Sequence, residues 1–116
     1  MGQPVVHFEI GSRRSDQAKQ FYSTLFGWDI QPQGPALMIA TGADGGIEGN
    51  ISQPETEPKN YVTIYVQVND IVASLKQVEK LGGKVLVPAS EVPGMGHFAW
   101  FADLDDNAIG LWKPAE

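Results

Sequence analysis

The stretch VVHFEI, residues 5–10, has the alternation of a β-strand with two different faces. Side chains on a strand point to opposite sides in turn. The apolar face is Val6, Phe8 and Ile10, and the other face is Val5, His7 and Glu9. The pattern returns in YVTIYVQV, residues 61–68, and a shift of 56 positions places His7 on Thr63. The sequence therefore predicts one module used twice.

Each of these strands precedes a helical pattern and further short strands. Ser15 or Asp16 is placed to cap a first helix that ends at Gly27, because short polar side chains accept from free amides and glycine ends helices. Asn69 or Asp70 is placed in the same way before a second helix. The later strands are expected at residues 28–30, 36–41, 47–52, 84–88, 96–102 and 108–113, the first of them broken by Pro32. Each module is then strand, helix, strand, strand, strand.

Length and composition favour one domain over residues 1–116. Within it we expect module one at 4–52, a proline-containing linker at 53–60 and module two at 61–113. Hydrophobic content of 42% with 19% charged residues is ordinary for a globular protein, and no apolar run approaches the roughly 20 residues of a membrane span. The first residues carry no basic region followed by an apolar stretch, so a cytoplasmic protein without a membrane partner is expected.

The chain has no cysteine, two histidines and a net charge of −6. Without cysteine, disulfides, thiolate zinc sites and a cysteine nucleophile are excluded, and any metal site must use histidine and carboxylates. The negative charge argues against a nucleic-acid partner, because phosphate binding needs clustered lysine and arginine.

The chain resembles the vicinal oxygen chelate superfamily, which includes glyoxalase I, bleomycin-resistance proteins and dihydroxybiphenyl-type dioxygenases. The resemblance is carried by His7 fourteen positions before Phe21, by the segments DQAKQFYSTLFGW, YVQVND and DLDDNAIGLW, and by the repeated βαβββ order. It implies an α+β fold in which tandem βαβββ modules form a cup-shaped mixed sheet with two helices packed on the outside. A ferredoxin-like α+β sandwich ranks second, because it has fewer strands after each helix.

Metal-dependent relatives in that superfamily place one ligand on each of four strands. The resemblance maps these positions to His7, Glu48, Thr63 and Gly110. Threonine is a poor ligand and glycine offers no side chain, so only His7 and Glu48 remain as weak metal candidates. No cofactor is expected, and a divalent metal stays an alternative with an incomplete ligand set. In that alternative a partner subunit or His97 would complete the site of a metal-dependent lyase or dioxygenase.

The resemblance implies a cup that holds a small organic molecule. For a catalyst we expect lyase- or isomerase-like proton transfer beside a carbonyl, with His7 or Glu48 as the base and Tyr65 or Asn50 polarising the substrate. The further candidates for ligand binding are Glu9, Thr63, His97, Trp100 and Trp112. The plainer interpretations also stand: they make His7 a hydrogen-bonding residue, Glu48 an exposed strand residue and His97 a residue at the rim.

A different class of function is a non-catalytic protein that binds or sequesters a drug-like or cationic compound, with acidic charge and aromatic residues giving affinity. Small proteins with open sheet edges also pair readily, so a homodimer is compatible with the sequence.

Overall fold

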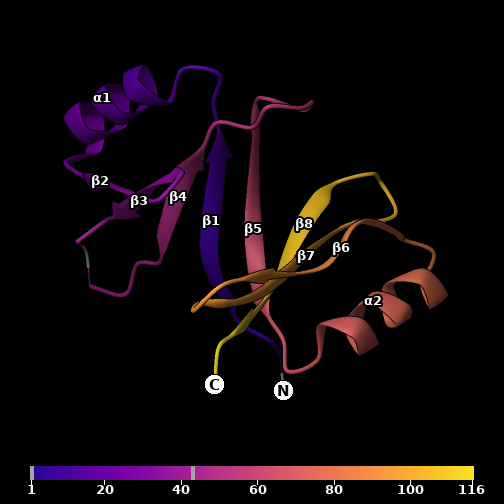
Figure 1. Cartoon of the computed structure of the whole chain (residues 1–116). Coiled ribbons are helices and arrows are strands. Elements are labelled where there is room, and N and C mark those ends of the chain that lie inside the picture. The colour runs from indigo at the N-terminus through magenta and orange to yellow at the C-terminus, as the bar shows by residue number, and fades with distance from the viewer. Residues whose placement is uncertain (1, 43) are drawn as a thin grey trace. The chain divides into compact units, whose positions relative to one another are not determined.

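The computed structural model describes residues 2–42 and 44–116, which contain eight strands and two helices (Figure 1). The chain divides into two compact units. One is His7–Thr63, here the 7–63 unit, and the other combines the described residues up to Val6 with Ile64–Glu116, here the 64–116 unit. The division falls within β1 (Val5–Gly11) and within β5 (Tyr61–Gln67), so the 7–63 unit includes most of β1 and the start of β5.

The 7–63 unit has the predicted order of strand, helix and three strands. Its elements after β1 are α1 (Ser15–Phe26), β2 (Asp29–Gln33), β3 (Ala36–Ala40) and β4 (Glu48–Ser52). Its strands lie in the order β2-β3-β4-β1, with β1 parallel to β4 and the other pairs antiparallel. A mixed sheet of this kind agrees with the expected fold.

Helix α1 packs on one face of these strands, beside β2, β3 and β4 (Figure 1). The buried residues Ile30, Ile39 and Ile51 form the centre of that core, and Ala18 and Tyr22 of α1 pack against them. Trp28, which follows the helix and also packs against this core, lies with its ring centroid 5.8 Å from that of Tyr22. The face of β1 and β4 away from α1 is therefore left for polar side chains.

Two local predictions for this unit were wrong. Neither Ser15 nor Asp16 caps α1: the cap position is Arg14, without a side-chain hydrogen bond, and Ser15 Oγ donates to Gln53 Oε1 at 2.8 Å. Pro32 does not break the strand after Trp28 but lies inside β2. Proline is tolerated there because β2 is at the end of the strand order and has a hydrogen-bonded neighbour on one side only.

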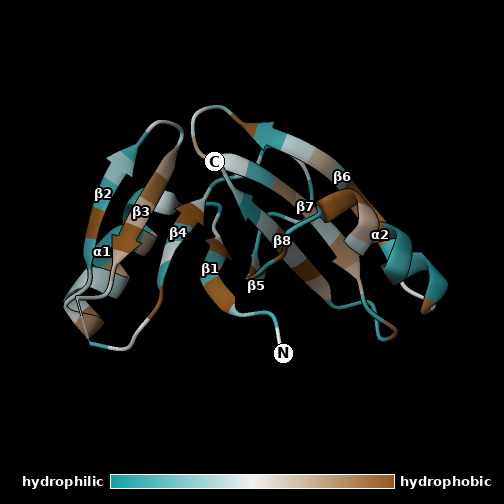
Figure 2. Cartoon of the chain, turned by 90° about the horizontal axis from the view of Figure 1, so that it is seen from below, coloured by the Kyte–Doolittle hydropathy of each residue, from teal (hydrophilic) through white to brown (hydrophobic). Residues whose placement is uncertain are grey.

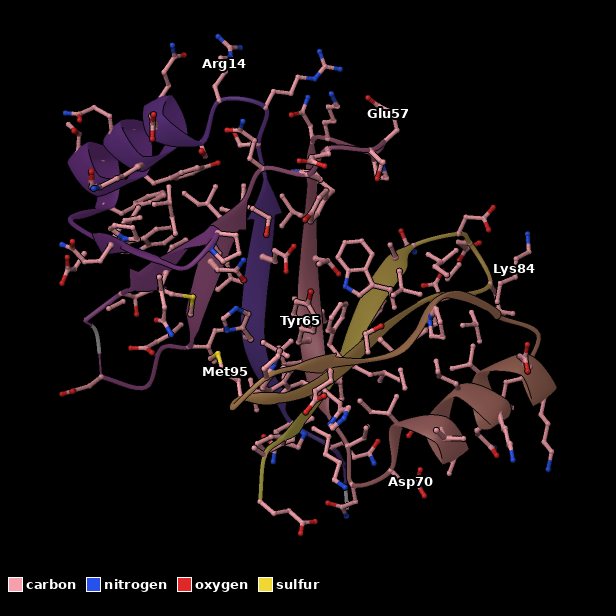
Figure 3. The ribbon with its side chains drawn as sticks, in the orientation of Figure 1. Arg14, Glu57, Tyr65, Asp70, Lys84 and Met95 are labelled. Carbon is pink, nitrogen blue, oxygen red and sulfur yellow. The ribbon has the colours of Figure 1, made fainter. Side chains whose placement is uncertain are left out.

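The 64–116 unit repeats the arrangement. Its further elements are α2 (Ile71–Lys80), β6 (Lys84–Val92), β7 (Gly96–Ala102) and β8 (Ala108–Pro114), and its strands lie in the order β5-β8-β7-β6. Asp70, labelled in Figure 3, caps α2 as predicted, since its Oδ1 accepts from the backbone N–H of Ala73 at 3.0 Å. Strand β6 runs beyond the expected 84–88 because irregularities in its pairing with β7 let it continue past Pro88.

Helix α2 covers one face of its strands through Ile71 and Leu75, which pack against Val68, Ala99 and Leu111. Polar and apolar bands accordingly succeed one another along the strands of both units (Figure 2). Eight strands and two helices in tandem βαβββ order confirm the α+β class. No helix among the described residues has the length and apolar character that crossing a bilayer requires.

Candidate functional site

Five polar side chains of the 7–63 unit lie on one face of β1 and β4. They are those of His7, Glu9, Glu48, Asn50 and Ser52. The parallel register places His7 opposite Glu48, Glu9 opposite Asn50 and Gly11 opposite Ser52. Residues that face each other across a ladder project to the same side. The candidates His7, Glu9, Glu48 and Asn50 therefore share one face, as the alternation in the sequence predicted.

His7 and Asn50 are joined directly. Nε2 of His7 lies 2.6 Å from Oδ1 of Asn50, and Nδ2 of Asn50 donates to Oγ of Ser52 at 3.1 Å. Asn50 is only 8% exposed, whereas His7 is half-buried. An amide oxygen can only accept, so the ring nitrogen that faces it must carry a proton. With Asn50 in this orientation, Nε2 is the donor nitrogen of His7.

Glu9 is the most deeply buried acidic side chain in the part of the chain that the structure describes, at 8% exposed. The phenol of Tyr61 donates to its Oε2, and the Tyr61 ring lies over Gly11, where a methyl group would come within 2.2 Å of Cε2. Burial raises the pKa of Tyr61 well above its usual range, and the hydrogen bond to Glu9 and its negative charge raise it further. A hydrogen bond from Ser52 acts in the opposite direction.

This arrangement predicts a loss of stability in alkali that depends on Tyr61. An unfolded tyrosine releases its proton near pH 10, at about its ordinary pKa, while the folded phenol keeps it to higher pH. The folded state then binds more protons than the unfolded state, so the free energy of unfolding falls as pH rises above about 10. Below that pH the contribution of Tyr61 to the free energy of unfolding does not change with pH. Urea unfolding at about pH 8 and about pH 11 should show a smaller fall for Tyr61→Phe than for the natural chain. An equal fall in both proteins would contradict the prediction.

The other two predicted residues of this unit differ in burial. Thr63 is 4% exposed, so its hydroxyl lies within the folded unit and not at its surface. Glu48 is exposed at the start of β4, although its backbone lies opposite His7. Glu48 therefore belongs to the same face as His7, at its solvent-accessible end.

Predicted aromatic residues meet in the 64–116 unit. Nε1 of Trp100 donates to Oη of Tyr65 at 2.9 Å, and both residues lie opposite Gly110 in the register of β8. Tyr65, labelled on β5 in Figure 3, places its ring across Gly110, where a methyl group would come within 2.4 Å of Cδ2. Trp112 follows Gly110 by two positions on the same face of β8. These three aromatic residues therefore lie on one face of the strands.

His97 is not brought into that group. It is exposed near the start of β7 and alternates with Phe98 and Trp100, so its side chain projects to the opposite side of the strand from Trp100. Its predicted part in ligand binding stays a prediction.

The four positions that metal-dependent relatives would use do not fit a metal ion here. His7 and Glu48 offer two donors, Thr63 offers a buried hydroxyl, and the place of a side chain at Gly110 is taken by the Tyr65 ring. Among residues 2–42 and 44–116 no group of three or more histidine and acidic side chains could hold an ion. A site of three or four protein ligands therefore needs donors that these residues do not supply.

Two residues of the polar group, Ser52 and Tyr61, were missed by sequence reasoning. The alternation of Glu48, Asn50 and Ser52 did place Ser52 on the polar face, and the same alternation put Tyr61 beside Thr63. What the sequence lacked was the register that brings Tyr61 to Glu9, 52 positions away. Contacts between strands so distant in sequence are not visible in either strand alone.

A groove of about 740 Å³ lies along α2 in the 64–116 unit. Its floor is apolar and includes Val66, Phe101 and Leu111, while Asp70 and Gln77 are among the polar residues on its helix side. None of the predicted site residues lines it. The groove and the polar group around His7 therefore have no residue in common.

Sequence comparison finds relatives over most of the chain. The family model described as "Glyoxalase/Bleomycin resistance protein/Dioxygenase superfamily" matches residues 5–111. A glyoxylase-like domain-containing protein of Didymella fabae is 34% identical over 112 residues, covering 89% of this chain and 88% of that protein. CFP32 of Mycobacterium bovis is 31% identical over 104 residues, which cover 83% of this chain. The chain spans only 40% of the length of CFP32.

Structural comparison agrees at the level of the fold. The crystal structure of a glyoxalase/bleomycin resistance protein/dioxygenase superfamily member from Vibrio splendidus 12B01 matches with a TM-score of 0.68 and 13% identity, covering 98% of this chain and 100% of that one. An identity this low supports a shared architecture and carries no statement on activity.

Proposed function

Because the chain belongs to the Glyoxalase/Bleomycin resistance protein/Dioxygenase superfamily, we propose that it binds a small carbonyl compound on the polar face of β1 and β4 and moves a proton at the adjacent carbon. The observation that supports this most is the hydrogen bond of 2.6 Å between His7 Nε2 and Asn50 Oδ1. It gives a half-buried imidazole a fixed orientation beside polar groups, which is what a general base requires.

In the proposed step His7 is the base. With the ring proton on Nε2, the basic lone pair of the neutral imidazole is on Nδ1. The C–H proton moves to Nδ1, the C–H electron pair becomes the double bond of an enolate, and the carbonyl oxygen takes the negative charge. Return of the proton gives a product of unchanged composition. No step passes through a metal ion.

Asn50 and Glu48 have supporting roles in this proposal. One amide hydrogen of Asn50 goes to Ser52, and we assign the second to the carbonyl oxygen of the substrate, where it would stabilise the developing charge. Glu48 stands opposite His7 in the register, and its negative charge would favour the imidazolium that forms when the proton is taken.

The test is solvent exchange. The protein is incubated in deuterium oxide with a panel of small carbonyl compounds that carry an acidic C–H, including aldehyde–thiol adducts, β-dicarbonyl compounds and acyl thioesters, and proton spectra follow the loss of the C–H signal. We expect exchange above a protein-free blank for at least one class, unchanged by a chelator. Recovery of every compound without exchange contradicts the proposal, and so does exchange that the chelator abolishes.

A second function is favoured by the aromatic group of the 64–116 unit. Trp100 and Tyr65 are tied together over Gly110, and flat ligands stack on fixed aromatic rings. The net charge of −6 would favour a flat aromatic ligand that is a cation. In this second function the ligand is bound and released unchanged. Titration with acridine orange, followed by tryptophan fluorescence, tests this function: binding that Trp100→Phe weakens and that returns the dye unchanged supports it.

A further inference from the structure

Five polar side chains of the 7–63 unit form one chain of hydrogen bonds. They are, in order, Glu9, Tyr61, Ser52, Asn50 and His7. Ser52 and the Tyr61 phenol are neighbours because the register sets Ser52 opposite Gly11, over which the Tyr61 ring lies. Three of the five can turn their donor and acceptor groups either way, since a hydroxyl both donates and accepts and an amide can flip. The direction of the whole chain therefore depends on a member that cannot turn.

Glu9 is that member. An ionised carboxylate only accepts, so the Tyr61 hydroxyl must donate its one hydrogen bond to Glu9. The Tyr61 oxygen can then only accept from Ser52, and Ser52, having donated to Tyr61, can only accept from Asn50. The amide nitrogen of Asn50 is thereby held toward Ser52, and its oxygen is held toward His7.

The position of Tyr61 in this chain is fixed by packing as well. Its ring lies over Gly11, with ring atoms at 2.2 and 2.3 Å from the place a β-carbon would take, so no larger residue fits beneath it. Because the Tyr61 ring is packed over Gly11, its phenol is held in place beside Glu9.

We infer that Tyr61 is a positioning residue which, through Ser52 and Asn50, holds the ring proton of His7 on Nε2. The inference rests on the proposed function only where it makes Nδ1 the catalytic base, because the tautomer is a property of the protein without substrate. Tyr61 itself touches neither the substrate nor the reacting proton. Its effect is to keep the basic nitrogen of His7 the same in every molecule.

The tautomer can be measured directly. Proton–nitrogen correlation spectra of the imidazole rings, recorded on isotopically labelled protein at about pH 8, distinguish the Nε2–H form from the Nδ1–H form of a neutral ring. His97, exposed on β7, provides an internal reference in the same spectrum. For the natural chain we expect His7 as the Nε2–H form.

The main variant is Tyr61→Phe, which keeps the ring over Gly11 and removes only the hydroxyl. Ser52 is then released to donate to Asn50, so the amide can flip and the ratio of His7 tautomers should shift toward Nδ1–H by about fivefold or more, the effect of losing one net hydrogen bond. Ser52→Ala interrupts the chain one step later and should shift the ratio in the same direction. It provides the test if Tyr61→Phe does not fold.

Tyr65→Phe is the matched control. Tyr65 is on the same strand and also lies over a glycine, Gly110, and the hydroxyl that the substitution removes accepts from Trp100. The His7 tautomer should be unchanged in it. The inference is overturned if the natural chain carries the Nδ1–H form, if the folded variants at Tyr61 and Ser52 leave the ratio unchanged, or if Tyr65→Phe shifts it equally. A protein with the expected tautomers and no solvent exchange would contradict the proposed function alone.

Discussion

His7→Ala is expected to slow the proposed exchange of the substrate proton by roughly 10²- to 10⁴-fold, the usual contribution of a positioned general base. The variant removes the imidazole and leaves Asn50 bonded to Ser52, so substrate affinity should change much less than the rate. The measurement is the rate constant of deuterium incorporation at saturating substrate, compared with the natural chain. A loss in rate constant with little change in affinity identifies an interaction made mainly in the transition state.

Two further variants make this prediction specific. His97→Ala removes the chain's other histidine, which projects away from Trp100 on β7, and should change the rate by less than about twofold. Glu48→Gln keeps the shape of a residue opposite His7 and removes its charge, so a loss of about tenfold is expected from weaker stabilisation of the imidazolium. Full activity in His7→Ala together with an inactive Glu48→Gln would transfer the role of base to Glu48.

The fold was open to prediction because period-two alternation is a local property. Alternation in residues 5–10 and 61–68 identified the leading strands, and it correctly placed His7 and Glu9 on one face of β1. The errors arose where a distant residue decided the outcome. Ser15 does not cap the helix, because its hydroxyl donates to Gln53, 38 positions later in the chain. Pro32 is tolerated inside β2 because that strand has a hydrogen-bonded neighbour on one side only.

The site was predicted in part for the same reason. Sequence alone put His7, Asn50 and Glu9 among the candidates, since each projects from the polar side of its strand. It could not find the bond between Tyr61 and Glu9, because that bond depends on the alignment of strands far apart in the chain. It also could not state that the glycine at position 110 is covered by an aromatic ring, which depends on the β5–β8 register.

Gly110→Ala is expected to lower the free energy of unfolding by about 1–3 kcal/mol, the usual cost of forcing an extra carbon into a packed site. The new methyl group would lie 2.4 Å from Cδ2 and 2.5 Å from Cε2 of Tyr65, far inside van der Waals contact. The ring cannot easily retreat, because Tyr65 is 7% exposed and its hydroxyl accepts from Trp100. Urea unfolding measures the change, and Gly2→Ala, where nothing lies within 4 Å of the added carbon, is the neutral control.

A double-mutant cycle with Tyr65→Ala isolates the cause. Once the ring is removed, Gly110→Ala has space for its methyl group and should cost much less, so the two substitutions should be coupled by about 1 kcal/mol or more. Equal costs of Gly110→Ala in both backgrounds would mean that the ring does not limit this position. The same steric argument explains why a metal-ligating side chain cannot simply be introduced at position 110. Gly110→Glu should destabilise the natural chain, because the Tyr65 ring occupies the space that the new side chain needs. Only in the Tyr65→Ala background would the carboxylate have that space.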